Sequence, residues 1–325
     1  MLPLGRILVA CAATFNSLSS CQVSTLPNWS LSPRNVNQSS VFDLTAPSTD
    51  LFRHVHLYQD TVYQSFTFDN KNRRLFVAQR PNNTPVEQGD LCITQLDFSG
   101  KILGHMWVKG AGHGVAIGAE AVGSDTYMWT EIDVKSNGYG DRIARFMYVN
   151  GATIDGGSKG LTKFKPVEGA GNTICTIDPS DDSLVCRYSF GDTKRIGAFP
   201  VAEAAANNFK NPLYDFEQPA LKGRSNVFQG FAAYGSYFYM LSGTAYEVNG
   251  NVVNSEVTSV DVNTGKIRQG PTLTKAGQSL SFREPEGMAV YTTADGEPRL
   301  FLGFASGVAG DRRCNIFYKN KLVAA

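Results

Sequence analysis

The chain has 325 residues, 42% of them hydrophobic and 18% charged, with a formal net charge of +1. This size can bury a large core in one or two domains, and the balanced charge gives no basic surface for nucleic acid. The 32 glycines, the 11% aromatic content and the scarcity of helical stripes predict an all-β chain with many turns.

The first 21 residues have the pattern of a secretory signal peptide. Arg6 is the basic end, residues 7–15 are apolar and residues 17–20 are small. The segment is too short to span a bilayer, and no later segment has 18 apolar residues, so we expect a secreted, extracellular protein without a transmembrane segment. A lipoprotein-type anchor on Cys21, or an ordinary buried N-terminal segment, is the alternative.

Residues 22–50 are rich in Ser, Asn, Pro and Thr, and they predict an irregular arm or linker. N-glycosylation triplets begin at Asn28, Asn37 and Asn82. These triplets would make the chain a glycoprotein if it is secreted by a eukaryotic cell.

Strand patterns follow one another from residue 51 onward, and five segments repeat one order. Each has a polar or small lip, an apolar strand, a turn and a second apolar strand. The repeats begin at Gln64, His113, Thr173, Gln229 and Glu286. Their separations of 49, 60, 56 and 57 residues, with about four strands per unit, predict a β-propeller with five blades.

The fifth unit is short, because only residues 315–318 can follow its first two strands. A strand at residues 52–57 precedes the first repeat and has no partner of its own. We therefore predict a ring over residues 51–323, closed by this N-terminal strand joining the last blade, which also removes exposed sheet edges.

Cys175 and Cys186 flank a turn at equal distance and predict a cross-strand disulfide, with two buried thiols as the alternative. Ring closure would bring Cys92 and Cys314 into the same half of the ring. The chain has no Cys-x-x-Cys and no His/Cys cluster, so neither a metal nor a cofactor is expected.

In a propeller the lips of the innermost strands meet at one mouth of the central channel. Amide, imidazole and charged groups at such a mouth suit sugar hydroxyls and carboxylates. The candidate ligand-binding residues are Gln64, His113, Trp129, Glu131, Gln229, Arg283 and Glu286. The alternative is a plugged channel in which these groups satisfy one another.

Trp129, which is close to Glu131 in sequence, is typical of a sugar-stacking residue, although a tryptophan in a strand can equally be core. Residues 136–142 form a glycine-rich segment that we place on the rim of the ring.

Catalysis at the same mouth is the main alternative to binding. A glycosidase needs two carboxyl groups, for which Glu286 and Glu284 are the leading candidates. A polysaccharide lyase needs a base such as His113, with Arg283 neutralising a sugar carboxylate. A third possibility is a protein-interaction scaffold in which the channel is inert. Arg283 and Glu284 can also simply pair with each other or with Arg142.

Three stretches resemble a known family: LFRHVHLYQDTVYQSFTFDNKNRRLFVAQ, QLDFSGKILGHMWVKGAGHGVAIG, and FREPEGMAVY with RLFLGFASGVAGDRR. They are similar to secreted propeller proteins of the teichoic-acid-biosynthesis-protein-C-like or phage-baseplate-like group. That group includes the propeller domain of staphylococcal phage receptor-binding proteins and is similar to helveticin-J-type proteins. The resemblance covers about residues 50–320 and implies a five-bladed propeller associated with cell-wall glycopolymers. It supplies no catalytic residue.

Overall fold

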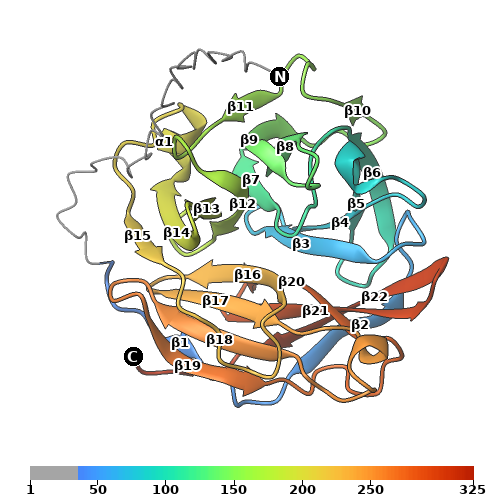
Figure 1. The fold of residues 1–325 in the computed structure, drawn as a ribbon, viewed down its shortest axis with the longest axis vertical. Coiled ribbons are helices and arrows are strands. Elements are labelled where there is room, and N and C mark those ends of the chain that lie inside the picture. Colours follow the sequence, from blue (N-terminus) through green and yellow to red (C-terminus); the bar gives the residue numbers. More distant parts are fainter. Residues whose placement is uncertain (1–35) are drawn as a thin grey trace, which may run out of the picture.

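The computed structural model describes residues 36–325. The predicted signal peptide, the lipid site at Cys21 and the triplet at Asn28 lie outside the described residues. Within them the chain forms five mainly antiparallel sheets of four or five strands around a common axis, and a two-stranded sheet beside them (Figure 1). The all-β prediction and the blade number are confirmed.

The blades follow one another along the chain, each starting at the axis. Blade 1 contains β3 (Tyr63–Asp69), β4 (Arg74–Gln79), β5 (Leu91–Leu96) and β6 (Ile102–Val108), with β10 (Thr153–Ile154) added in parallel at its edge. Blade 2 contains β7 (Gly118–Val122), β8 (Asp125–Val134), β9 (Gly140–Met147) and β11 (Thr162–Phe164). Blade 3 contains β12 (Gly171–Asp178), β13 (Ser183–Phe190), β14 (Thr193–Pro200) and β15 (Tyr214–Glu217), with α1 (Val201–Ala205) after β14.

Blade 4 contains β16 (Phe228–Tyr234), β17 (Tyr237–Ser242), β18 (Glu256–Asp261) and β19 (Lys266–Leu273). Blade 5 contains β20 (Glu284–Thr292), β21 (Pro298–Val308), β22 (Asp311–Lys319) and, as its outermost strand, β2 (Thr49–Val55). The short helices η1 (Val86–Gln88) and η2 (Tyr246–Val248) lie in loops. Each innermost strand contacts the innermost strands of the two adjacent blades, which closes the ring.

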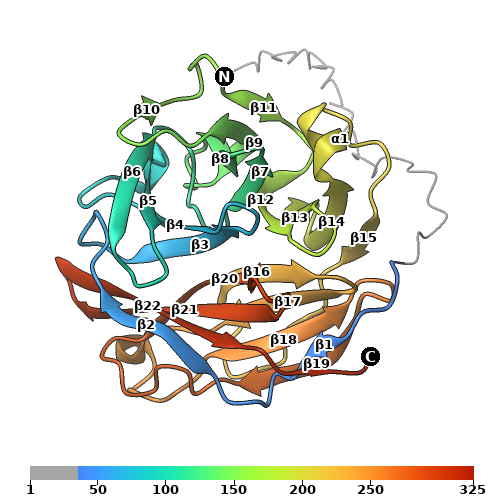
Figure 2. The same cartoon turned by 180° about the vertical axis from the view of Figure 1, so that it is seen from behind.

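The N-terminal strand closes the ring as predicted. β2 pairs antiparallel with β22, with Thr49 opposite Tyr318 (Figure 2). The strand begins before the predicted residue 52, and β1 (Val41–Phe42) adds a second seal by pairing with β23 (Leu322–Val323).

The described part of the predicted arm packs on blade 4. The Val36 amide donates to Asn263 Oδ1 at 2.8 Å, the Ser39 amide donates to Ser236 Oγ at 3.0 Å, and Phe42 is fully buried.

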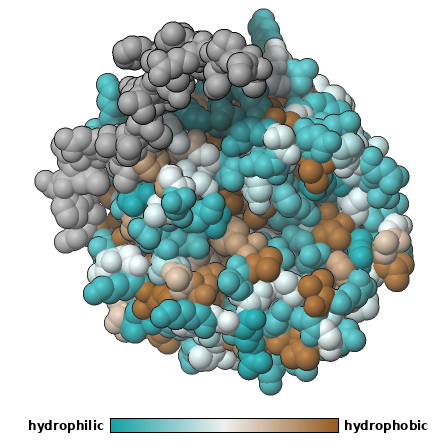
Figure 3. Space-filling view, viewed as in Figure 1, coloured by the Kyte–Doolittle hydropathy of each residue, from teal (hydrophilic) through white to brown (hydrophobic). Residues whose placement is uncertain are grey.

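Apolar side chains fill the spaces between adjacent sheets, because strand residues alternate between the two faces. Between blades 1 and 5, for example, the rings of Phe68 and Phe301 lie 4.8 Å apart and contact Tyr291. Burying one such aromatic side chain stabilises the fold by about 1.5–3 kcal/mol. On the outer surface hydrophobic residues occur in small groups among hydrophilic ones (Figure 3).

The predicted disulfide is not formed. Cys175 and Cys186 lie directly opposite each other in the register of β12 and β13, as the spacing indicated, but both are free thiols. They are fully buried among Trp129, Leu184 and Phe199, and this burial raises the pKa of both thiols. Cys92 and Cys314 are also buried free thiols, in blades 1 and 5.

The predicted start of the inner strand of blade 2 also needs correction. The predicted inner strand began at His113, whereas β7 begins at Gly118. Gly114 has a φ of +81°, a conformation that suits glycine and interrupts a strand. Residues 111–117 therefore form a loop at the mouth of the ring.

Candidate functional site

The backbones of four lips meet at the axis. A Cβ atom on Gly230 would lie 2.7 Å from Gly287 Cα, and one on Gly287 would lie 2.8 Å from Ser65 Cα. Ser65 Oγ donates to the Gly114 carbonyl oxygen at 2.6 Å. The glycines behind the predicted lips therefore allow neighbouring backbones to approach, and they leave no space for a ligand between blades 4, 5 and 1 at this level.

Arg283 is a buried structural residue rather than a ligand-binding residue. Its side chain is fully buried. Its guanidinium donates to the carbonyl oxygens of Thr274 and Ala276 at 2.8–3.0 Å and to Ser255 Oγ at 2.9 Å. It also lies 4.3 Å from the centre of the Phe304 ring. The prediction that Arg283 contacts a ligand is therefore wrong, because loop carbonyls occupy its donors.

Trp129 and Glu131 on β8 are two further corrections, since both side chains are fully buried. Trp129 stacks on Phe164 and donates from Nε1 to Glu120 Oε2 at 2.8 Å, so its ring offers no face to a sugar. The Glu131 carboxylate accepts from the amides of Gly114 at 3.0 Å and Gly140 at 2.8 Å.

Glu131 thereby joins two glycine-rich loops. Burial raises the pKa of its carboxyl group to about 7, although the amide donors lower it. We assign Glu131 the role of positioning the loops that carry His113 and Tyr139.

Glu286 and Glu284 stand on the lip of blade 5. Glu286 is buried, with an exposed fraction of 6%, and Glu284 is half-buried. Burial, reinforced by the charge of Glu284, raises the pKa of Glu286 well above its usual range. Burial also raises the pKa of Glu284, against the lowering effect of Arg312. Both carboxyl groups therefore ionise less readily than a free glutamate side chain.

His113 lies in the loop before β7, where its ring stacks on Tyr139 with the centres 5.3 Å apart. Burial, assisted by the positive charge of Arg80, lowers the pKa of His113 to about 4, so the imidazole is neutral near pH 7. Tyr139 belongs to the glycine-rich segment that the sequence placed on the rim. His113 and Tyr139 together form an aromatic pair at the mouth.

Gln64 and Gln229 are the lip residues of blades 1 and 4, and both are half-buried. The amide of Gln64 donates weakly to the Val62 carbonyl oxygen at 3.5 Å, and that of Gln229 donates to the Gly243 carbonyl oxygen at 3.2 Å. Each amide retains hydrogen-bonding capacity for a ligand.

Sequence reasoning missed an arginine in blade 3. Arg187, half-buried on β13, lies with its guanidinium carbon 3.9 Å from the centre of the Phe228 ring on β16. Its Nε donates to Gln218 Oε1 at 2.7 Å, and within residues 36–325 it forms no ion pair with a carboxylate. A lone arginine in the apolar run Leu184–Tyr188 was the available signal. We call Arg187, Tyr139, Phe228, Gln218 and Lys194 the blade 3 lip.

Positive charge at the blade 3 lip is uncompensated. Burial lowers the pKa of Arg187 to about 10, while Tyr139 raises it, so the guanidinium remains charged near pH 7. Lys194 has a pKa lowered by burial and then by repulsion from Arg187. Lys194 is exposed and donates from Nζ to Ser189 Oγ, whereas Arg187 keeps guanidinium donors that have no partner within residues 36–325. The blade 3 lip is therefore a candidate anion site.

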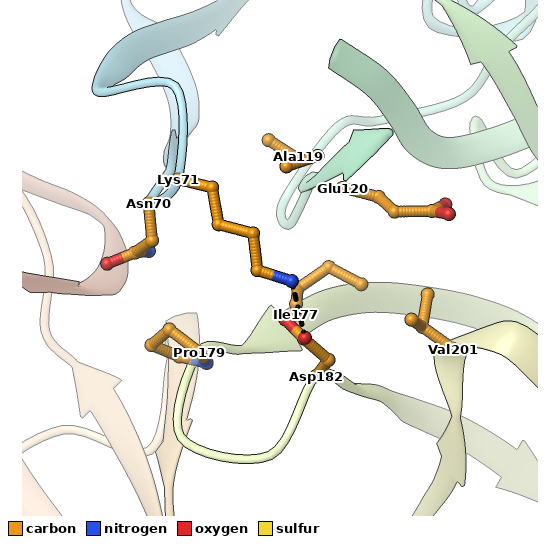
Figure 4. Close-up of a pocket in the computed structure, with 9 residues that line it drawn as sticks. Asn70, Lys71, Ala119, Glu120, Ile177, Pro179, Asp182 and Val201 are labelled. Carbon is orange, nitrogen blue, oxygen red and sulfur yellow. Dashed lines mark hydrogen bonds and ion pairs between the residues drawn. The ribbon is translucent and has the colours of Figure 1, made fainter. Parts of the chain in front are cut away.

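The opposite mouth is narrow and spanned by an ion pair. A cavity of about 100 Å³ lies there between blades 1, 2 and 3, which is room for a few water molecules. Lys71 reaches across it and donates from Nζ to Asp182 Oδ2 at 2.7 Å, beside Asn70 and Pro179 (Figure 4). This cavity is too small for a sugar chain.

The geometry defines a five-bladed propeller, and a family model agrees. Residues 62–318 match the family described as "Phage 5-bladed beta propeller receptor binding platform domain", so the chain belongs to that family.

Two known proteins are similar. "Putative major teichoic acid biosynthesis protein C" of Bacillus subtilis (strain 168) is 29% identical over 296 residues, which cover 87% of this chain and 64% of that protein. The tail fiber of Staphylococcus aureus phage P68 matches with a TM-score of 0.66 and 21% identity, over 88% of this chain and 55% of that chain. This chain thus spans under two thirds of the length of either relative. The second likeness concerns the fold alone.

No helix among residues 36–325 has the length and apolar character needed to cross a membrane. The same residues contain no group of three or more His, Cys, Asp or Glu side chains placed to hold a metal ion.

Proposed function

We propose that this chain binds an anionic cell-surface glycopolymer, outside the cell, at the blade 3 lip. The observation that carries the proposal is Arg187, a partly desolvated guanidinium beside aromatic rings with no carboxylate partner in the described chain. Desolvating a charge is costly unless a partner compensates it, and an anionic ligand would supply that partner.

The rest of the mouth fits a sugar-bearing polymer. Tyr139 and His113 stack on each other, and the outer face of this half-buried pair would be the part that a sugar ring contacts. Gln64 and Gln229 offer amides to hydroxyl groups. The ligand would thus bring negative charge to blade 3 and hydroxyl groups to the axis.

The comparisons support this chemistry. The matched family is described as a receptor binding platform, and one relative is named for teichoic acid biosynthesis. Teichoic acids are polyol phosphate polymers that carry sugars, so they present both the anion and the hydroxyl groups that this mouth would recognise.

The test is calorimetric titration of the purified chain with teichoic acid and with a neutral polysaccharide of similar length. We expect the anionic polymer alone to bind, with an affinity that falls as salt rises, because salt screens charge. Equal affinity for the neutral polymer, or affinity independent of salt, would refute the proposal.

Glycoside hydrolysis is a second candidate, favoured by one observation. Burial and the charge of Glu284 raise the pKa of Glu286, and a carboxyl group with a raised pKa is what a glycosidase uses as its general acid. Release of reducing ends from a cell-wall polymer, abolished in Glu286→Gln, would establish this reaction. If the chain neither binds nor cleaves any polymer, the hypothesis of a protein-interaction scaffold remains.

A further inference from the structure

A second cavity lies at the outer edge of the ring, away from the blade 3 lip. It has a volume of about 480 Å³, which is within the size range of small-molecule sites. Its walls are the chain segment before β2, the segment that follows β19, and the end of β22. The lining residues that carry the argument are Ser48, Asp50, Arg53, Lys275 and Lys319.

Lys319 is the most unusual of these residues, because only 3% of it is exposed. Its ammonium donates to the Ala46 carbonyl oxygen and forms no ion pair in the described chain. Burial lowers the pKa of Lys319, and Asp43, the nearby carboxylate that opposes this lowering, is itself paired with Lys321 at 2.9 Å. An ammonium has three donors, so two N–H groups of Lys319 lack an acceptor among residues 36–325.

Ser48 is an independent sign of a missing partner. Its hydroxyl oxygen is buried and has no hydrogen-bond partner within residues 36–325. Buried polar groups are nearly always satisfied, and an unpaired one costs free energy. An acceptor placed in the cavity could satisfy both Ser48 and Lys319.

The charges around the cavity favour an anion. Arg53, Lys275 and Lys319 are positive, and Asp50 is the one negative lining residue. Asp50 is already engaged by Arg53, whose guanidinium also donates to Ser279 Oγ at 3.1 Å. Fixed charge at the back of the cavity and mobile charge on exposed Lys275 at its rim together provide donors for several oxygens.

Arg283 supports one wall of the cavity. Its guanidinium donates to the carbonyl oxygens of Thr274 and Ala276, which flank Lys275 in the sequence. Arg283, on the lip of blade 5, thus helps to hold the segment that carries Lys275.

We propose that this cavity binds a phosphoryl group carried on a small polyol or sugar. Lys319 and Ser48 would hold the phosphate oxygens, and Arg53 and Lys275 would cover its outer side. The room around the phosphate is sufficient for the attached polyol. This site is separate from the blade 3 lip and does not depend on the function proposed there.

Calorimetry with sn-glycerol 3-phosphate, glycerophosphoglycerol and glycerol tests the proposal. We expect the phosphate esters to bind and glycerol not to bind. Binding of the monoester alone identifies a free phosphorylated metabolite, and equal binding of the diester identifies a unit of a polymer. Failure of both esters to bind would overturn the proposal.

Variants assign the binding to this cavity. Lys319→Met should weaken ester binding about 10- to 100-fold, as expected for loss of a charged hydrogen bond. Ser48→Ala removes an unpaired hydroxyl, so it should weaken binding several-fold without lowering the thermal midpoint of the free protein. It keeps the test valid if Lys319→Met does not fold.

Two controls separate this site from other binding. Lys101→Met changes an exposed lysine outside the cavity, and it should leave ester binding unchanged. Arg187→Gln should also leave it unchanged. Loss of ester binding in Arg187→Gln together with retention in Ser48→Ala and Lys319→Met would place the ester at the blade 3 lip and refute the cavity.

Discussion

Arg187 and Arg283 make an instructive pair. Each is an arginine on a mouth-forming segment, each lies over an aromatic ring, and burial lowers the pKa of each to about 10. Neither forms an ion pair with a carboxylate within residues 36–325. The Arg283 guanidinium donates hydrogen bonds to two loop carbonyl oxygens and a serine hydroxyl, whereas that of Arg187 donates one hydrogen bond, to Gln218.

The difference shows that charge at a lip does not by itself mark a binding residue. The number of free donors decides whether an arginine can bind a ligand, because a ligand can bond only to donors that have no partner in the protein. By this criterion the blade 3 lip is a candidate site, and Arg283 is a structural element of blade 5.

The largest expected effect is on folding. Arg283→Met would leave buried carbonyl oxygens without donors and should lower the free energy of unfolding by about 3–5 kcal/mol. Arg187→Met should change it by less than about 1 kcal/mol, since it breaks one half-buried bond. Urea unfolding of both variants measures the contrast. Equal losses in the two variants would erase the distinction between these arginines.

The pH dependence separates the arginines from the buried carboxyl groups. Burial raises the pKa of Asp178 from 3.8 to about 7. The unfolded chain therefore releases this proton first, and the stability that Asp178 contributes is present below pH 4 and lost as pH rises towards 7. The Asp178→Asn variant does not lose this contribution. As the pH rises from 4.5 to 7.5, its free energy of unfolding should therefore increase relative to that of the natural chain, on the order of 3 kcal/mol.

Urea unfolding at both pH values measures this gain. Polymer affinity should meanwhile be flat between pH 5.5 and 8, because both guanidiniums stay charged and His113, with a pKa of about 4, stays neutral. A steep change of affinity in that range would mean that another group dominates binding.

The aromatic partners offer a smaller contrast. Phe228→Leu should weaken polymer binding by about 3- to 10-fold, because the ring positions Arg187 through a cation–π contact. Phe304→Leu alters the equivalent ring under Arg283, and it should lower stability by about 1–3 kcal/mol without changing affinity. Calorimetry measures the affinity of both variants, and urea unfolding measures their stability. A loss of affinity in Phe304→Leu together with a loss of stability in Phe228→Leu would contradict the comparison.

The smallest effect is expected at Glu286. Burial raises the pKa of Glu286 well above its usual range and so favours the neutral carboxyl group, which a glutamine resembles. Glu286→Gln should therefore change polymer affinity less than about twofold and stability by less than about 1 kcal/mol. Binding and unfolding measurements at pH 7 suffice. A loss of polymer cleavage in this variant would instead establish the hydrolase.

The architecture could be predicted because it depends on local patterns. Apolar strand pairs recur at a steady spacing, and the segment that became β2 had no partner until the short fifth blade supplied one. The start of β7 was missed because Ala111–Ile117 has a strand-like composition, yet a buried carboxylate from Glu131 holds it as a loop.

The site was harder to predict because its chemistry depends on distant partners. Arg283 beside an apolar strand looks the same in sequence whether it faces a ligand or the carbonyls of residues 274–276. Trp129 similarly finds its partners in Phe164 and Glu120. Arg187 gains its meaning only when blade 4 brings Phe228 against it.

The most direct measurement is the affinity of Arg187→Gln for teichoic acid, compared by calorimetry with Arg268→Gln, which changes an exposed arginine on β19. We predict a loss of about 10- to 100-fold for Arg187→Gln and no change for Arg268→Gln. Equal affinities for the two variants, with both folded, would contradict the assignment of binding to the blade 3 lip.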